Sequence, residues 1–320
     1  MSGDDHVPDG VDDLYRPPRD ADAWAAATVD GSTWEAVVGR HRHLTAGDPE
    51  LAALAGQGAR LAAAHQSGAL AGLYEAPRLV ALALLGSGSL ACLRGDGDEP
   101  EVVGHVAAIH AALVAAERTG PDALGSEDWI RSTHALACAP QVTHPVLTAT
   151  GGTADHVLGH GDYKHHANHR HLGHGAWRAH APVAAVRAEL GRLAAGLAGE
   201  GTHLHPVTRA AYALHGLHHV APFAAGNGRV ARVLASGFLL RAGAGPLLIF
   251  AADRARYDGA LAAAADGHPA PLVDLVLGSC VEEADLLHDV SDRSPARPEV
   301  AEAVAQWRRR SHAAAALVGL

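Results

Sequence analysis

The stretch APFAAGNGRVAR at residues 221–232 is the most informative part of this 320-residue sequence. Its Pro-Phe pair is typical of a loop, and Gly226 and Gly228 have no side chains that would keep a ligand away from the backbone. Asn227 can cap a helix that starts at this point. The stretch therefore predicts a tight loop at the start of a helix.

Two arginines follow the loop at a spacing that suits an anion. Arg229 and Arg232 are three residues apart, so they share one face of the predicted helix. The N–H groups at the start of a helix, the helix dipole and a guanidinium all attract phosphate. The arrangement predicts a binding site for a di- or triphosphate. The alternative is a plain turn with two surface arginines.

The same residues resemble the motif of the Fic (Fido) family, HPFx(D/E)(G/A)NGRxxR. The matching residues are Pro222, Phe223, Gly226, Asn227, Gly228, Arg229 and Arg232. Upstream, the segment 130–139 is similar to the helix that carries the family's early histidine, here His134, and Gly161–Lys164 is similar to its GxYR. The resemblance runs from residue 126 to residue 288.

The resemblance implies an all-α fold, with a Fic/Fido-like helical core, a small β-hairpin flap and an N-terminal helical extension. In the family, the flap aligns the target chain above the site. By position the flap lies in His169–Trp177, so we expect Arg170 and Trp177 to contact a substrate or a protein partner. The alternative is a solvated loop with Trp177 packed onto the body.

The resemblance also implies a chemistry from which this chain departs. The family transfers AMP from ATP, or another phosphate-bearing group, to a target hydroxyl. Its motif histidine takes the hydroxyl proton, and its acidic residue holds Mg²⁺ on the phosphates. Here Ala221 and Ala225 stand at these two positions, and alanine can neither accept a proton nor bind a cation. We therefore expect a degenerate Fic-family protein that binds a nucleotide, such as ATP, or a phosphorylated small molecule, with AMP transfer lost or strongly reduced and Mg²⁺ in doubt.

Three explanations of the two alanines stay open at this point. The chain is a pseudoenzyme, an inactive engineered variant, or a repurposed enzyme that acts on a small phosphorylated or nucleotide-linked substrate. The third requires a displaced histidine, for which His219 is the catalytic candidate and His218, or a histidine of residues 156–180, is an alternative. A histidine near the end of a helix is also a favourable partner of the helix dipole.

Histidines are concentrated between residues 156 and 180, where zinc or nickel binding is one interpretation. The spacings contain no HExxH, and the nearby carboxylates are Asp155 and Asp162. We therefore predict no metal site and expect solvated histidines or contacts with a partner. The string Ser279–Glu283 resembles the family's inhibitory motif (S/T)xxxE(G/N) only by chance.

Composition shifts divide the chain into four regions. Asp and Pro are dense in residues 1–22, which predicts an acidic, disordered leader. Ala- and Leu-rich helical patterns predict an N-terminal helical extension at 23–125 and a C-terminal helix at 291–320, and the family resemblance places the Fic/Fido-like domain at 126–290. A long Gly- and His-rich loop is expected at 150–182.

Charge and apolar patterning exclude several classes of protein. The formal net charge is −10 and no Lys/Arg-rich block occurs, which argues against a nucleic-acid or anionic-membrane binder. No apolar run is long enough to span a bilayer. The polar N-terminus differs from a signal peptide, and the three cysteines form no CxxC pair. These features favour the cytoplasm.

Overall fold

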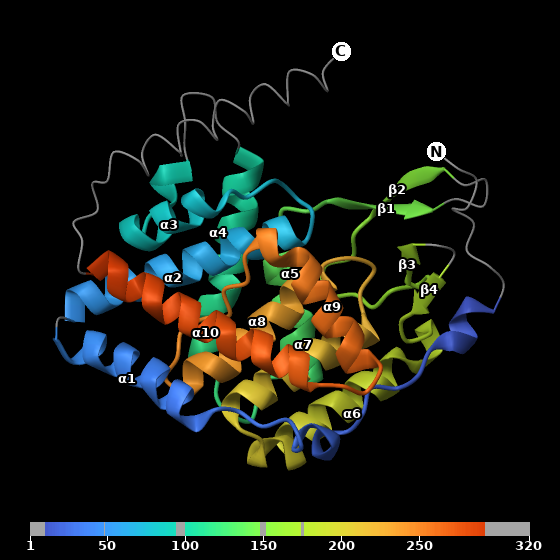
Figure 1. Cartoon of the computed structure of the whole chain (residues 1–320). Coiled ribbons are helices and arrows are strands. Elements are labelled where there is room, and N and C mark those ends of the chain that lie inside the picture. The colour runs from blue at the N-terminus through green and yellow to red at the C-terminus, as the bar shows by residue number, and fades with distance from the viewer. Residues whose placement is uncertain (1–9, 48, 94–99, 148–151, 174–175, 292–320) are drawn as a thin grey trace.

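The computed structural model describes residues 10–47, 49–93, 100–147, 152–173 and 176–291 (Figure 1). These residues fold into helices with two short β-hairpins, which confirms the predicted all-α class. Within this part of the chain, no helix combines the length and the apolar character needed to cross a membrane. The C-terminal helix expected at 291–320 lies outside the described residues. Only its first residue, Ser291, is described, and it is the last residue of the preceding helix.

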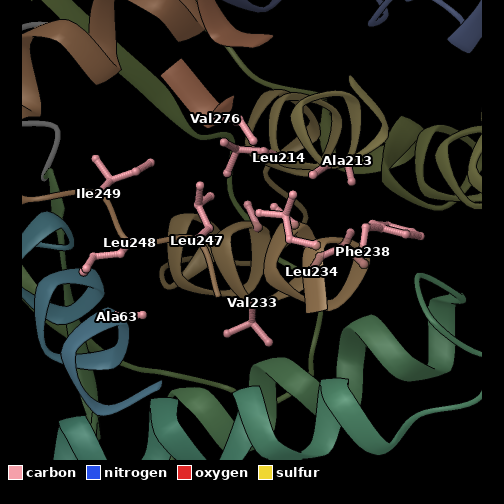
Figure 2. Packing of buried hydrophobic residues seen from close by; sticks show 14 of the residues in the cluster. Ala63, Ala213, Leu214, Val233, Leu234, Phe238, Leu247, Leu248, Ile249 and Val276 are labelled. Atoms are coloured by element: carbon pink, nitrogen blue, oxygen red, sulfur yellow. The ribbon is translucent and has the colours of Figure 1, made fainter. Parts of the chain in front are cut away.

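Helices α7 (Pro206–Val220) and α8 (Asn227–Arg241) form the most extensive helix pair in the described part of the chain. Figure 2 shows their apolar side chains, among them Leu214 and Leu234, meeting in the buried core. The loop at residues 221–226 is therefore held between two packed helices. We call it the α7–α8 loop.

The two ends of α7 follow from its local sequence. Pro206 takes the first helical position, where its missing N–H is not needed, and the Val207 N–H donates to His205 Nδ1 at 3.3 Å. At the other end Ala221 has a left-handed conformation that stops the helix, with φ +46° and ψ 65°. The α7–α8 loop begins at this residue.

Other helices surround the central pair. Contacts to α8 come from α2 (Pro49–Leu70), α4 (Pro100–Arg118) and α5 (Glu127–Ala137), while α10 (Ala270–Ser291) packs on α7 and on α1 (Gly31–Gly47). One continuous hydrophobic cluster joins the expected N-terminal extension to the domain that follows it. The remaining helical elements are α3 (Arg78–Ser87), α6 (Val186–Ala198), α9 (Arg254–Ala265), η3 (Leu90–Leu93), η4 (Val183–Ala185), η5 (Glu200–His203) and η6 (Ala251–Asp253).

Two antiparallel hairpins lie on the same side of the helical body (Figure 1). Strands β3 (His169–Gly173) and β4 (Ala176–Ala179) pair where the small flap hairpin is predicted. Strands β1 (Thr143–Leu147) and β2 (Thr153–Val157) form a second hairpin that the sequence pattern does not predict. Their residues do not alternate between apolar and polar, and Pro145 is tolerated because β1 is an edge strand.

The expectation of a disordered leader does not hold for residues 10–22. The 3-10 helices η1 (Val11–Leu14) and η2 (Ala21–Trp24) contribute buried apolar side chains, and the Trp24 ring lies 5.5 Å from the His215 ring of α7. A few apolar residues between the aspartates are enough to pack this segment on the body. Residues 1–9 lie outside the described residues.

Candidate functional site

The α7–α8 loop is closed by the side chain of Asn227. The Phe223 N–H donates to Asn227 Oδ1 at 2.9 Å, and Asn227 Nδ2 donates to the Phe223 carbonyl at 2.7 Å. Asn227 is the first residue of α8 and Gly226, with φ +79°, is its N-cap, whereas the sequence predicts Asn227 as the cap. The difference arises because the amide both donates and accepts across the loop instead of bonding forward into the helix.

Gly226 sits directly on α5. A Cβ added there would lie 2.4 Å from Cys138 Sγ and 3.1 Å from both His134 Nε2 and Arg229 Nη2. A positive φ and this crowding both require glycine. The loop backbone can therefore approach α5 as closely as it does only with glycine at this position.

His134 joins α5 to two loops. The Gly161 N–H donates to its Nδ1 at 2.9 Å, so the proton is on Nε2, which donates to the Ala225 carbonyl at 3.0 Å. The ring stacks on Phe223 with centroids 3.8 Å apart. Burial lowers the pKa of His134 to about 4, so the ring is neutral near pH 7 and supports the loop through hydrogen bonds.

Arg229, two residues into α8, is buried, with 1% of its surface exposed. Its Nη2 donates to Gln141 Oε1, while its Nε and Nη1 have no hydrogen-bond partner among the described residues. Burial lowers the pKa of Arg229, but a guanidinium keeps its proton at neutral pH. Two donors of a buried cation are thus left for a ligand.

Arg232, the second arginine of the motif, is 4% exposed and is held by α2. Its Nε donates to Ser67 Oγ and its Nη2 to the Ser67 carbonyl, both at 2.8 Å, and its Nη1 lies 3.5 Å from Tyr257 Oη. In the described part of the chain, neither Arg229 nor Arg232 pairs with a carboxylate. The site therefore carries two buried positive charges.

A cavity of about 830 Å³ opens over this arrangement, which is within the usual size range of small-molecule sites. It brings together most of the site residues predicted from the sequence: Ala221, Gly226, Asn227, Gly228, Arg229 and Arg232. Ala225 contributes its carbonyl to His134, while the neighbouring Ala224 lines the cavity. The predicted anion loop and the cavity thus coincide.

Helix α7 presents His218 to the cavity, and not the predicted His219. The His218 ring lies 6.2 Å from His180 and 6.5 Å from Tyr257. His219 instead faces the N-terminal segment, where its Nε2 donates to the Arg16 carbonyl at 2.7 Å. Successive helical residues point about 100° apart, so the rotation of α7 in its packing decides which of the two faces the ligand.

Arg170 and Trp177 are the two residues that the sequence predicts for the flap. Trp177 is half-buried in β4 opposite His171, and it is not among the described residues that line the cavity. Arg170 pairs with Arg178 in the hairpin register, but its side chain lies outside the described part. The structure therefore assigns neither residue to the cavity.

Sequence reasoning missed Gln141 and Ser67, which orient the two arginines from 88 and 165 residues away. No local signal marks either residue. The string Ser279–Glu283 lies in α10. There Glu283 accepts a hydrogen bond from His41 at 2.9 Å, and not from Arg229 or Arg232. Among the described residues, no group of three or more His, Cys, Asp or Glu is placed to hold a metal ion.

Comparison with known proteins matches residues 103–239 to the Fic/DOC family. "Protein adenylyltransferase Fic" of Drosophila persimilis is 41% identical over 80 residues, which are 25% of this chain and 16% of that protein. The Drosophila melanogaster protein of the same name is 40% identical over a stretch of equal length. The chain thus matches only about one sixth of the length of these curated relatives.

Solved structures show the same fold at low sequence identity. A Fic-domain-containing signaling protein from Bacteroides thetaiotaomicron aligns with a TM-score of 0.63 and 17% identity, over 83% of this chain and 99% of that one. Fic-1 from C. elegans aligns with a TM-score of 0.57 and 19% identity, over 81% of this chain and 71% of that one. The motif residues, the helical fold and the family match agree: this chain carries a Fic/DOC domain at residues 103–239, and its described residues share the helical fold of Fic-domain structures.

Proposed function

We propose that the α7–α8 loop and the first turn of α8 bind the phosphates of a nucleotide or of another polyphosphate. The observation that carries the proposal is the burial of Arg229 and Arg232 without a carboxylate partner among the described residues. A buried charge without a counter-charge costs several kcal/mol. A bound phosphate removes this cost and accepts hydrogen bonds from Arg229 Nε and Nη1.

We further propose that AMP transfer to protein hydroxyls is lost or strongly reduced. Relatives are named adenylyltransferases, but this chain has Ala221 at the edge of the cavity and Ala225 beside it, where the family resemblance places the base and the metal ligand. The remaining loop holds phosphate through N–H groups and arginines. Ligand binding is therefore proposed to be independent of Mg²⁺.

His218 supports a second candidate function, a transferase acting on a small phosphorylated or nucleotide-linked substrate. His218 lies one turn before Ala221 and shares the cavity with Arg229, so it can serve as the displaced base. His218→Gln is then expected to abolish turnover of a nucleotide by mass spectrometry while ligand binding persists. The matched His219→Gln variant is expected to keep turnover, because His219 faces Arg16. Equal loss in both variants would contradict this role.

Two further elements belong to the proposal. The β3–β4 hairpin is the surface at which a protein partner would bind, as the family resemblance implies.

We place the function in the cytoplasm, in line with the buried free thiols of Cys138 and Cys280. Partner capture on a hairpin variant and fractionation of the native protein test these two statements.

The first test is a binding measurement on the Arg229→Met variant. ATP and inorganic pyrophosphate, with and without Mg²⁺, are expected to stabilise the unmodified chain by about 2.7 kcal/mol at a concentration of 100 times Kd. Arg229→Met is expected to lose this gain, and without ligand to be at least as stable as the unmodified chain, because it removes a buried, partly unsatisfied cation. Chemical unfolding with and without ligand measures both effects.

The control for this test is Arg241→Met, which removes an exposed arginine from the last turn of the same helix. It is expected to leave the ligand-dependent gain unchanged. A normal gain in Arg229→Met would show that the ligand binds elsewhere. A gain that requires Mg²⁺ would contradict binding without the metal.

A further inference from the structure

The last turn of α2 lies beside the cavity and holds two arginines that line it. Ser67 accepts hydrogen bonds from Arg232 through its hydroxyl and its carbonyl, both at 2.8 Å. Two residues later, the Ala69 carbonyl accepts a hydrogen bond from Arg254 Nη2 at 2.9 Å. The C-terminal end of a helix carries a partial negative charge, so it is a favourable place for guanidinium groups. One helix end therefore fixes both cations at the cavity.

The same helix end also fixes the backbone that carries Arg254. Gln66 is 1% exposed, and its Oε1 accepts a hydrogen bond from the Ala251 N–H at 2.8 Å. Ala251 begins η6, which runs directly into α9 with Arg254 as its first residue. The place of the Arg254 side chain is therefore set twice by α2, through the Gln66 amide at the backbone and through the Ala69 carbonyl at the guanidinium.

Tyr257 links Arg254 to the arginines of the motif. Arg254 and Tyr257 are three residues apart in α9, so they share one face of the helix, and both line the cavity. The Tyr257 hydroxyl lies 3.5 Å from Arg232 Nη1. A Cβ added to Gly228 would lie 3.0 Å from the same Nη1, so Arg232 reaches back to the first turn of α8. The order across the cavity is therefore the start of α8, then Arg232, then Arg254.

We propose that Arg254 binds the distal phosphate of a ligand whose nearest phosphate lies at Arg229, and that it thereby selects ligands with three or more linked phosphates. This inference rests on the proposed function, since Arg229 holds the first phosphate. Asp258 of the same helix lines the cavity as well, so the selection depends on the place of Arg254 and not on an excess of positive charge. Both α2 and Arg254 lie outside residues 103–239, so parts of the chain beyond its Fic/DOC match carry the selection.

Calorimetric titration of the full chain with inorganic pyrophosphate and tripolyphosphate, in EDTA, tests this selection. The variant is Arg254→Gln and the matched control is Arg256→Gln. Arg256 is exposed in the same helix but is not among the described residues that line the cavity, and a Cβ added to Gly278 of α10 would lie 3.8 Å from its Nη2. Each variant removes one positive charge, and about 0.15 M salt screens charges more than about 8 Å apart. Both arginines are exposed, so neither change is expected to unfold the chain.

The unmodified chain and Arg256→Gln are expected to bind tripolyphosphate at least about tenfold more tightly than pyrophosphate, because hydrogen bonds between charged groups reach this strength. Arg254→Gln should bind pyrophosphate as the unmodified chain does and should lose the preference for tripolyphosphate. A second series uses ADP and ATP. The same preference for the longer ligand assigns the phosphates to a nucleotide, and a preference confined to the inorganic pair assigns them to inorganic polyphosphate.

Several results would contradict the role of Arg254. Equal affinity of the unmodified chain for the shorter and the longer ligand in both series overturns the selection without the use of any variant. A preference that persists in Arg254→Gln, or that is lost to the same extent in Arg256→Gln, overturns its assignment to Arg254. An equal loss of affinity for both ligands in Arg254→Gln does so too. If the unmodified chain binds none of the four ligands, the proposed function itself is overturned.

Discussion

Lowering the pH from about 6.5 to about 4 is expected to destabilise the folded chain by several kcal/mol, most steeply near pH 5. Burial lowers the pKa of His65 and of His215 to about 3, and that of His134 to about 4. In the unfolded chain each has an ordinary pKa near 6.5. Between these limits the unfolded state binds three more protons than the folded state, so stability is full above about pH 6.5 and falls as the pH is lowered.

The expected slope near pH 5 is about 4 kcal/mol per pH unit, three protons at about 1.4 kcal/mol each. That slope is large against a typical domain stability of about 5–15 kcal/mol. His41 acts in the opposite sense, because Glu283 raises its pKa and this contribution is lost as the pH rises. Urea unfolding at half-unit pH steps, followed by circular dichroism, measures the slope.

The variant His215→Leu measures the contribution of one of the three buried histidines to this pH dependence. Both ring nitrogens of His215 lack a hydrogen-bond partner among the described residues. The variant with leucine is therefore expected to be at least as stable as the unmodified chain near pH 7. The slope near pH 5 should fall by about a third, or about 1.4 kcal/mol per pH unit. The exposed His203→Leu should leave it unchanged. A flat profile for the unmodified chain from pH 6.5 to pH 5 would mean that these rings reach water.

The contrast between local and long-range contacts explains which features the sequence predicts. The α7–α8 loop is a local structure, since Asn227 forms hydrogen bonds with Phe223 only four residues away. Its motif is therefore contained in one short stretch of sequence. Arg232 depends on Ser67, which no periodicity links to it. The orientation of His218 and His219 depends in the same way on the packing of the whole of α7.

Weak patterns account for the remaining differences. The strands of the β1–β2 hairpin do not alternate strictly between apolar and polar residues, so composition alone favours a loop. The segment at residues 10–22 is rich in aspartate, but Val11 and Ala21 are buried and anchor it. In both places a few tertiary contacts override the average character of the segment.

The buried position of Arg229 connects stability to function. Arg229 is retained in a buried position where its hydrogen bonds only partly satisfy it, since among the described residues its guanidinium donates to Gln141 alone. A chain that no longer bound phosphate would gain stability by replacing this residue with an apolar one. The arginine is therefore easier to explain as a ligand group than as a structural one.

The double variant Ala221→His/Ala225→Asp is expected to gain AMP transfer by at least about 10²-fold, because general base catalysis alone is worth about 10²–10⁴. Ala221 already has the left-handed conformation that histidine tolerates better than most residues, and it lines the cavity beside Arg229. An aspartate at 225 restores a carboxylate for Mg²⁺ next to the phosphate loop. Intact mass measurement after incubation with ATP and Mg²⁺ detects self-modification by one AMP.

Two matched variants show whether the gain comes from the restored groups. Ala221→His/Ala224→Asp moves the carboxylate by one residue, and its AMP transfer should increase much less. Adding Arg229→Met to the double variant Ala221→His/Ala225→Asp should abolish the increase, because it removes the guanidinium that we propose binds the phosphates. If the double variant binds ATP with Mg²⁺ and still transfers nothing, the two alanines are not what limits the reaction. If the unmodified chain transfers AMP as fast as the double variant, the protein is an active enzyme and the base must be sought at His218, the histidine that α7 already directs into the cavity.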